Sequence, residues 1–348
     1  MSTPFLLYGA NGYTAQIMLP LCAQYGLKPI LAGRSEDKIA PLAQQYGYEY
    51  RIFDLNDPTQ TDAGLEGVGA VLHCAGPFAY TARQMMASCL RKGVHYLDIT
   101  GEISVFELAH SLSEQAKAKG ITLMPGSGFD VVPTDCLALE LKERMPDATH
   151  LAMAFASVKG GLSQGTALTM ASTMGEGGLI RKNGKIIQVP LGHRGEEIDF
   201  GVAKQFCITI PWGDVSTAFY TTGIPNIEMM TASSPKAYAK LKYQWAYNWF
   251  LRLSLVRNAA KKKIMARPAG PSEERRAKAH TMLWGEVKNA KGEKITITKV
   301  VAEGYTLTAH SALWLTAQIL QGKGKPGFFT PAGLFGKDII KILKMERG

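Results

Sequence analysis

The chain has 348 residues, of which 46% are hydrophobic and 20% are charged. This balance is typical of globular proteins rather than disordered ones, and the length favours two domains. The absence of any uninterrupted apolar run of about 18 residues argues against a transmembrane helix. The net charge of +10 suits an anionic partner, whether nucleic acid, a membrane surface or a small molecule.

The first residues of the chain and the spacing of its cysteines together predict a cytoplasmic protein. The first residues run directly into a strand without a preceding basic segment, which argues against a signal peptide. The five cysteines form no CxxC pair and show no metal-ligand spacing, so no metal site is expected. An odd, scattered set of this kind is typical of reduced thiols in the cytosol.

Short apolar runs alternate with helical patterns through the first third of the chain. Strands are predicted at residues 5–8, 29–32, 48–53, 68–74, 95–99 and 121–124. Helices are predicted at residues 12–25, 38–46, 81–92 and 104–119, with Pro20 kinking or shortening the first. This alternation predicts an α/β domain over residues 1–130, a Rossmann-type doubly wound parallel sheet with helices on both faces.

The loop after the first strand carries the clearest functional signal. It has a GxxGxxA pattern in which Gly9 allows a tight turn, Gly12 lets backbone approach a pyrophosphate, and Ala15 keeps the helix close to the sheet. The first helix begins here and offers its N–H groups to phosphate. The predicted cofactor-binding residues of this loop are Gly9, Asn11, Gly12, Tyr13, Thr14 and Ala15. The alternative is an ordinary strand-to-helix turn.

The end of the second strand indicates which dinucleotide binds. NAD-binding folds usually carry Asp or Glu at this point to hold the ribose 2′-hydroxyl, whereas this chain has Arg34 and Ser35. A guanidinium binds a 2′-phosphate bidentately and stacks on adenine, and the serine adds a hydroxyl donor. The sequence therefore predicts NADP as cofactor; the alternative is that Arg34 is an ordinary surface arginine.

The next two strands end in residues that a bound dinucleotide would pass. Asp54 and Leu55 follow the third strand, where an acid commonly reaches the adenine amino group. Small residues after the fourth strand allow close approach to the nicotinamide ribose. These predicted cofactor-binding residues are Cys74, Ala75, Gly76 and Pro77.

Three side chains are candidates for catalysis by their location alone. Tyr80 follows the fourth strand, Asp98 ends the fifth, and Asp130 follows the sixth. A carboxyl group there would orient substrate or relay a proton. For the two aspartates, helix capping and turn formation are equally good readings.

Several segments together resemble the saccharopine dehydrogenase-like oxidoreductases and look closest to the branch that includes the trans-acting enoyl reductases. They are residues 9–15, 75–78, 95–102, 125–135, 163–166, 270–275 and 330–333. The resemblance implies a Rossmann domain with a second, mixed α/β domain, and use of NADPH to reduce a C=C or C=N bond. The chain departs from the family pattern at Asn11 and Ala15, and at His73, where the family often has Asn.

The second part of the chain reads as a substrate or dimerisation domain over residues 131–305, which predicts a homodimer. Strands are predicted at residues 151–158, 206–210, 227–231, 282–287 and 294–301, and Asn183-Gly184 predicts a hairpin. Thr166 is expected to cap a helix or to face substrate. Residues 306–348 are predicted to form a C-terminal helix and tail that pack back on the first domain.

Residues 236–265 combine clustered aromatic and aliphatic side chains with basic ones. One interpretation is an amphipathic helix that contacts a membrane peripherally or grips an acyl chain. The other, which the sequence favours, is a helix partly buried against the protein. Nucleic acid is not expected as a partner, because no recognised binding module accompanies the charge.

Two classes of function remain open at this point. The first is an NADPH-dependent reductase that acts on an unsaturated acyl, lipid-like or other hydrophobic substrate. The second is a non-catalytic NADP-binding protein, a redox sensor or scaffold that retains the fold. Fold alone does not decide between them.

Overall fold

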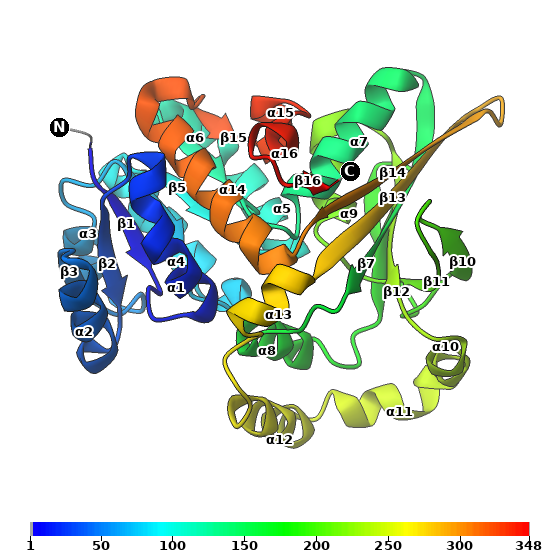
Figure 1. Cartoon of the computed structure of the whole chain (residues 1–348), viewed down its shortest axis with the longest axis horizontal. Helices are drawn as coiled ribbons and strands as arrows, with labels where there is room; N and C mark the ends of the chain where they lie inside the picture. The colour runs from blue at the N-terminus through cyan, green and yellow to red at the C-terminus, as the bar shows by residue number, and fades with distance from the viewer. Residues whose placement is uncertain (1–2, 348) are drawn as a thin grey trace. The chain divides into compact units, whose positions relative to one another are not determined.

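The computed structural model describes residues 3–347; residues 1, 2 and 348, at the ends of the first and last predicted domains, lie outside it. The described chain forms two compact units. Unit 1 comprises residues 3–132 and 305–335, and unit 2 comprises residues 133–304 and 336–347. Each unit has its own sheet (Figure 1).

Unit 1 contains a seven-stranded sheet in the order β15-β6-β5-β4-β1-β2-β3. All its strand pairs are parallel. The strands are β1 (Phe5–Tyr8), β2 (Pro29–Gly33), β3 (Tyr50–Ile52), β4 (Ala70–His73), β5 (His95–Asp98), β6 (Thr122–Met124) and β15 (Gly327–Phe328). The predicted parallel α/β sheet is confirmed. The order reverses between β1 and β4, and ligands of such sheets bind beyond the carboxyl ends of the strands at this reversal.

Helices cover the sheet of unit 1. They are α1 (Tyr13–Met18), α2 (Glu36–Tyr46), α3 (Pro58–Gly64), α4 (Ala82–Lys92), α5 (Ile103–Ser111), α6 (Ser113–Ala118), α14 (Gly304–Gln318) and α15 (Pro331–Phe335). The predicted helix over residues 12–25 ends at Met18 and continues as a 3-10 helix, η1 (Leu19–Tyr25), with Pro20 in its first turn. The helix predicted over residues 104–119 is two helices, because Leu112 leaves the helical conformation between α5 and α6.

The central strands of unit 1 are buried and largely apolar because both faces of the sheet are covered there, whereas the edge strand β3 is partly exposed. All four residues of β1 and all four of β4 are buried. This continuous burial, rather than an alternation of apolar and polar residues, is what parallel strands under helices require. The candidate site lies in the loops that follow these strands.

Unit 2 contains a nine-stranded mixed sheet, as the predicted second α/β domain requires. Its strands are β7 (Ala148–Val158), β8 (Gly178–Lys182), β9 (Lys185–Val189), β10 (Gly195–Asp199), β11 (Lys204–Thr209), β12 (Asn226–Ala232), β13 (His280–Asn289), β14 (Lys294–Ala302) and β16 (Glu346–Arg347). β12 pairs with β7 in parallel, and the other pairs are antiparallel. The predicted hairpin joins β8 to β9 through Asn183 and Gly184, which both have positive φ.

The helices of unit 2 flank this sheet. They are α7 (Val132–Arg144), α8 (Gln164–Ser172), α9 (Asp214–Thr222), α10 (Pro235–Leu241), α11 (Gln244–Leu251), α12 (Ser254–Met265), α13 (Glu273–Lys278) and α16 (Ile339–Ile342). Ser163, not Thr166, is the N-cap of α8, and its hydroxyl accepts the backbone N–H of Thr166. Within residues 3–347, no helix is long and apolar enough to cross a membrane.

The C-terminal residues divide between the two units. α14 and α15 belong to unit 1, whereas residues 336–347 belong to unit 2. The tail joins unit 2 because β16 pairs with β14 and the backbone N–H of Ala302 donates to Met345 O at 2.8 Å. This division differs from the predicted boundary, which placed the whole of residues 306–348 with the first domain.

Candidate functional site

The loop from β1 to α1 bends tightly against the end of β2. Gly9 has a φ of 81°, and its backbone N–H donates to Ala32 O at 2.8 Å. The N–H of Gly12 then donates back to Gly9 O at 2.8 Å. A Cβ atom on Gly12 would lie 3.1 Å from that same oxygen, so only glycine fits here without a shift.

Helix α1 starts without a side-chain cap. Gly12 is the N-cap residue, and as a glycine it has no side chain that could cap the first turn. The side chain of Gln16 donates from Nε2 to Asn11 O at 2.8 Å, which fixes the loop between β1 and α1 to the helix. A glycine at the N-cap lets a ligand approach the backbone at the positive end of the helix, the arrangement that suits an anion.

Arg34 and Ser35 follow β2 at the same end of the sheet, and both are exposed. Within residues 3–347, no carboxylate pairs with the Arg34 guanidinium. Ser35 occupies the N-cap position of α2, but its side chain makes no capping hydrogen bond. Both polar groups therefore remain available to a ligand.

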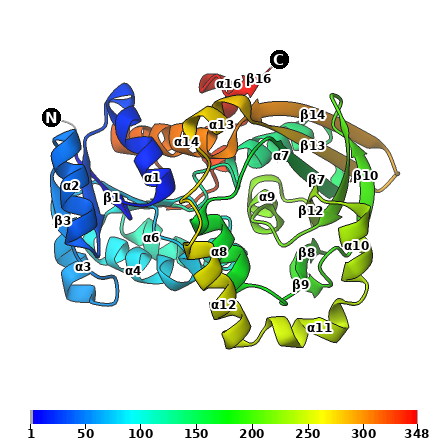
Figure 2. The same cartoon turned by 60° about the horizontal axis from the view of Figure 1, so that its bottom comes forward.

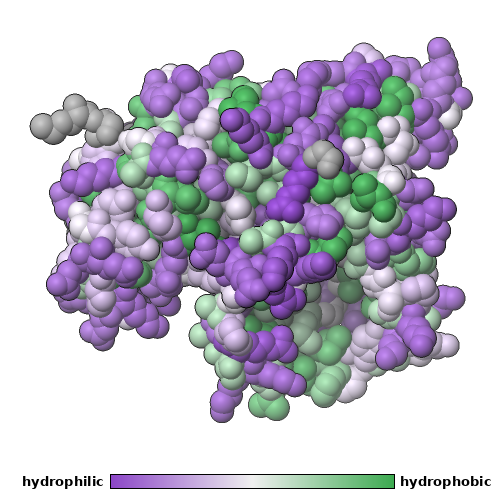
Figure 3. Space-filling model, in the orientation of Figure 1, coloured by the Kyte–Doolittle hydropathy of each residue, from purple (hydrophilic) through white to green (hydrophobic). Residues whose placement is uncertain are grey.

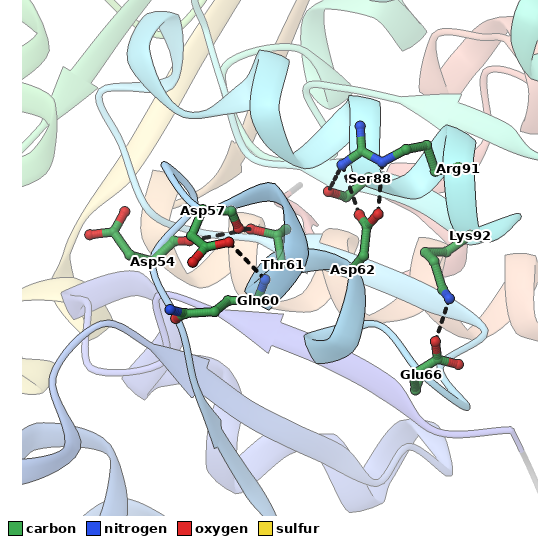
Figure 4. Close-up of polar contacts among 9 residues, drawn as sticks. All are labelled: Asp54, Asp57, Gln60, Thr61, Asp62, Glu66, Ser88, Arg91 and Lys92. Atoms are coloured by element: carbon green, nitrogen blue, oxygen red, sulfur yellow. Dashed lines mark hydrogen bonds and ion pairs between the residues drawn. The ribbon is translucent and has the colours of Figure 1, made fainter.

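Asp54 and Leu55 follow β3, next to helix α3 (Figure 4). One Asp54 carboxylate oxygen accepts the backbone N–H of Asn56 at 2.9 Å and its side-chain amide at 2.8 Å. Leu55 is buried. Asp57 caps α3 by accepting the N–H of Gln60 at 3.0 Å, so Asp54 is not needed as a cap.

The loop after β4 lies directly beside the glycine loop. Cys74 donates its backbone N–H to Tyr8 O at 2.8 Å, and Ala75 lies against Gly9. Burial raises the pKa of the Cys74 thiol, so that thiol stays protonated. The Gly76–Pro77 peptide bond is cis. The predicted small residues after β4 thus approach the glycine loop closely.

Glu102 organises this loop, a role that the sequence did not reveal. Its two carboxylate oxygens accept the backbone N–H groups of Phe78 at 2.8 Å and Ala79 at 2.9 Å. Both donors lie in the short helix η2 (Phe78–Tyr80). Burial raises the pKa of Glu102, while these two hydrogen bonds oppose the shift. The carboxylate therefore ties the end of β5 to the loop after β4.

His73 is the second residue whose role the sequence left undefined. Its ring is fully buried beside Tyr8, and Nε2 lies 2.9 Å from the Thr81 hydroxyl, which donates to Ala75 O at 2.8 Å. Burial lowers the pKa of His73 to about 3, so the ring is neutral at physiological pH. The histidine supports the loop from below rather than facing solvent.

The three catalytic candidates differ in access to a ligand. Tyr80 is 62% exposed. Asp98 is fully buried and accepts the Tyr96 hydroxyl at 2.7 Å and two backbone N–H groups, from Thr100 at 3.0 Å and Gly126 at 2.8 Å. That pattern fits a residue that fixes the loops after β5 and β6.

Asp130 retains some accessible surface and lies against Gly101, where an added Cβ atom would be 2.6 Å from its Oδ2 atom. Burial, with a contribution from the Glu102 carboxylate, raises the pKa of Asp130 to about 7. Burial likewise raises the pKa of Asp98 to about 7, against its three hydrogen bonds. Within residues 3–347, no group of three His, Cys, Asp or Glu side chains is placed to hold a metal ion.

The geometry above suits a dinucleotide, and comparison with known proteins shows which domain this part of the chain resembles. Residues 5–124 match the family model of the saccharopine dehydrogenase NADP binding domain. The N-terminal segment is thus similar to the saccharopine dehydrogenase NADP-binding domains. The predicted family resemblance is confirmed, as is NADP as the cofactor of the domain's family.

Relatives with curated names are similar to about half of the chain or less. The saccharopine dehydrogenase-like oxidoreductase of Rattus norvegicus is 26% identical over 208 residues, which cover 51% of this chain and 48% of the relative. The trans-acting enoyl reductase of Mycobacterium leprae (strain TN) is 28% identical over 151 residues, 40% of this chain and 35% of the relative. The chain thus spans about half the length of the first relative and about a third of the second.

One solved structure shares the fold over the whole chain. Apo saccharopine dehydrogenase (L-Glu forming) from Saccharomyces cerevisiae has a TM-score of 0.68 at 14% sequence identity, covering 99% of each chain. At this identity the likeness shows the fold alone. The predicted combination of a parallel sheet domain with a second mixed domain is confirmed by it.

Proposed function

We propose that this protein is an NADPH-dependent oxidoreductase that reduces a C=C or C=N bond of a hydrophobic, acyl- or lipid-like substrate. The observation that carries the proposal is the NADP-binding domain over residues 5–124, with its glycine loop intact and Arg34 exposed at the end of β2. The names of the matched relatives, an oxidoreductase and an enoyl reductase, support the class of reaction.

The residues of unit 1 fit NADPH. Gly9 and Gly12 leave a backbone cradle that a Cβ atom would fill, and the pyrophosphate would bind there at the start of α1. Arg34 would hold the 2′-phosphate, because its guanidinium pairs with no carboxylate of residues 3–347, and Ser35 would add a hydroxyl donor. NADPH, when bound, supplies the hydride.

Reduction of a C=C or C=N bond also needs a proton, which the protein must deliver or hold. Of the three candidates, Asp130 is the one we propose as donor. Asp98 is fully buried and occupied by three hydrogen-bond donors, and Tyr80 lies on an exposed short helix. A carboxyl group with a raised pKa is protonated in a useful fraction near neutral pH, as a general acid must be.

The test is a turnover screen preceded by a binding measurement. NADPH and NADH are titrated against the purified chain by thermal shift and fluorescence, and NADPH oxidation is then followed with enoyl thioesters and cyclic imines. Oxidation with either substrate class supports the reductase. Tight NADPH binding without turnover of any substrate would favour the redox sensor or scaffold, and failure to bind either nucleotide would refute both functions. The cytoplasmic location and the homodimer stay predictions.

A further inference from the structure

Helices α10, α11 and α12 form one edge of unit 2, and none of their residues is fully buried (Figure 2). This exposure includes large apolar side chains. Trp245 is 78% exposed, Trp249 65% and Leu255 81%. Further exposed members of the same segment are Tyr243, Phe250, Leu253 and Met265. Contiguous apolar exposure of this kind usually marks an interaction site.

Helix α11 presents its apolar side outward and a polar side inward. Gln244 faces the protein, where its Oε1 accepts the backbone N–H of Leu191 and its Nε2 donates to Leu191 O, both at 2.9 Å. Trp245 and Trp249 lie one turn apart on the exposed side. A surface helix of a soluble protein normally has the reverse arrangement, so burial in its own unit does not explain these tryptophans.

The segment is nevertheless attached to its unit. The guanidinium of Arg252 donates to Gly175 O at 2.8 Å, and that of Arg257 donates to Met174 O at 2.6 Å and pairs with Glu176 at 3.0 Å. Helix α12 also packs against α8. The exposed aromatic side chains therefore lie on helices that are fixed to unit 2 by these contacts.

The same segment carries nearly all of the excess charge of the protein. Residues 229–272 contain no Asp or Glu, and nine Lys or Arg lie within residues 236–267. The net charge of the whole chain is +10, so everything outside this segment carries only +1. The cationic residues are Lys236, Lys240, Lys242, Arg252, Arg257, Lys261, Lys262, Lys263 and Arg267. Within the described chain, Arg257 alone among the nine forms an ion pair.

We propose that α11 and α12 bind the surface of an anionic lipid bilayer. Indole and phenol rings favour the boundary between headgroups and acyl chains, and lysines next to them are attracted by anionic headgroups. In Figure 3, hydrophobic and hydrophilic residues gather side by side over these helices at the lower edge of unit 2. A second copy of the chain is a poorer occupant, because it would bring together two surfaces that both carry the cationic lysines 261–263.

This inference does not rest on the proposed function, since it uses no residue of the NADP site. It adds a location to that function, because a hydrophobic substrate partitions into the layer to which the enzyme would bind. Attachment through surface helices needs no helix that spans the bilayer, and it is reversible and sensitive to salt.

The test is co-sedimentation of the full chain with vesicles of phosphatidylcholine alone and of phosphatidylcholine mixed with phosphatidylglycerol. Binding to the anionic vesicles and not to the neutral ones is expected, and it should weaken as NaCl rises from about 0.1 to about 1 M. The variants W245S/W249S and K262E/K263E should each lower the partition coefficient at least about tenfold. Matched controls on exposed strands and loops of unit 2, V202S and K182E/K185E, should bind as wild type does.

Each other outcome would overturn the proposal. Failure of the wild type to sediment with anionic vesicles at low salt would do so, as would unchanged binding by W245S/W249S. If the wild type instead forms a dimer that W245S/W249S dissociates, with no vesicle binding, the face is a subunit interface. Binding to an acidic acyl carrier protein but not to vesicles would likewise assign it to a protein partner. A cooperative thermal unfolding transition near that of the wild type, measured on every variant, verifies that each is folded.

Discussion

A Cβ atom added to Gly9 would lie 2.9 Å from the Cβ atom of Ala75. The first residue follows β1 and the second follows β4, so the two loops at the reversal of the sheet touch through a glycine. The contact explains why the loop after β4 begins with small residues. Position 9 therefore requires glycine for two reasons, a positive φ and a crowded neighbour, and a sequence pattern cannot distinguish them.

Gly9→Ala is expected to weaken NADPH binding at least about tenfold and to lower stability by about 1–3 kcal/mol, since it strains the backbone and forces the loops apart. Gly47→Ala is the matched control, because Gly47 also has a positive φ of 67° but nothing lies within 4 Å of its added Cβ. The control should lose stability and keep NADPH affinity. Equal NADPH affinity in Gly9→Ala and wild type, measured by fluorescence titration, would contradict the prediction.

Six of the seven parallel strands were predictable because each contains apolar residues between its own turn residues. The seventh was not, since β15 has two residues and exists only through its pairing of Gly327 with Thr122, far away in the sequence. The site shows the same division. The glycines and Arg34 are visible as a local pattern, whereas the hydrogen bonds of Glu102 to Phe78 and Ala79 join residues more than 20 positions apart.

The orientation of α11 was also beyond the sequence. Its pattern of aromatic and polar residues has two opposite faces, and the sequence favoured the apolar face as the buried one. Hydrogen bonds of Gln244 to Leu191 set the opposite orientation, and only the tertiary structure supplies that partner.

Arg34→Ala is expected to weaken NADPH binding about 10- to 100-fold and to leave NADH binding nearly unchanged, because charge-assisted hydrogen bonds to the 2′-phosphate are lost. Lys28→Ala is the control: Lys28 is exposed and precedes β2, at the end of the strand away from Arg34. Dissociation constants for both nucleotides test the prediction. A parallel loss of NADPH and NADH binding would show that Arg34 does not read the 2′-phosphate.

Glu102→Gln should loosen the loop after β4. The amide has one acceptor oxygen, so one of the N–H groups of Phe78 and Ala79 loses its partner, at a cost of about 1–3 kcal/mol. Faster hydrogen exchange at these two amides is expected, together with weaker NADPH binding. Glu66→Gln, which removes an exposed charge that pairs with Lys92, is the control and should leave both amides unchanged. Wild-type protection of both amides in Glu102→Gln would argue against this role.

Asp130→Asn should lower kcat of the NADPH-dependent reduction by about 10²- to 10⁴-fold, with NADPH affinity unchanged, if Asp130 donates the proton. The wild-type rate should fall as pH rises above about 7, because the raised pKa of Asp130 keeps its carboxyl protonated only below that value. The residual rate of Asp130→Asn should not show this fall above about pH 7. Asp98→Asn should mainly change stability, and a loss of kcat confined to it would transfer the donor role to Asp98.

The buried imidazole of His73 should make unit 1 sensitive to acid. Its pKa is lowered to about 3 in the folded protein, whereas an unfolded histidine has the ordinary value of 6.5. Between these values the unfolded chain binds a proton that the folded chain does not, so the free energy of unfolding falls as pH falls through this window. From pH 7 to pH 5 the contribution lost is about 2 kcal/mol.

His73→Asn removes this titration, so its loss of stability between pH 7 and pH 5 should be smaller than that of the wild type. Urea unfolding of both proteins at the two pH values measures the difference. His193→Asn, at an exposed loop position of unit 2, should behave as wild type. If His73→Asn and wild type lose the same free energy on acidification, the ring of His73 is charged or solvated in the folded protein. In that case it cannot be the neutral support beneath the loop that follows β4.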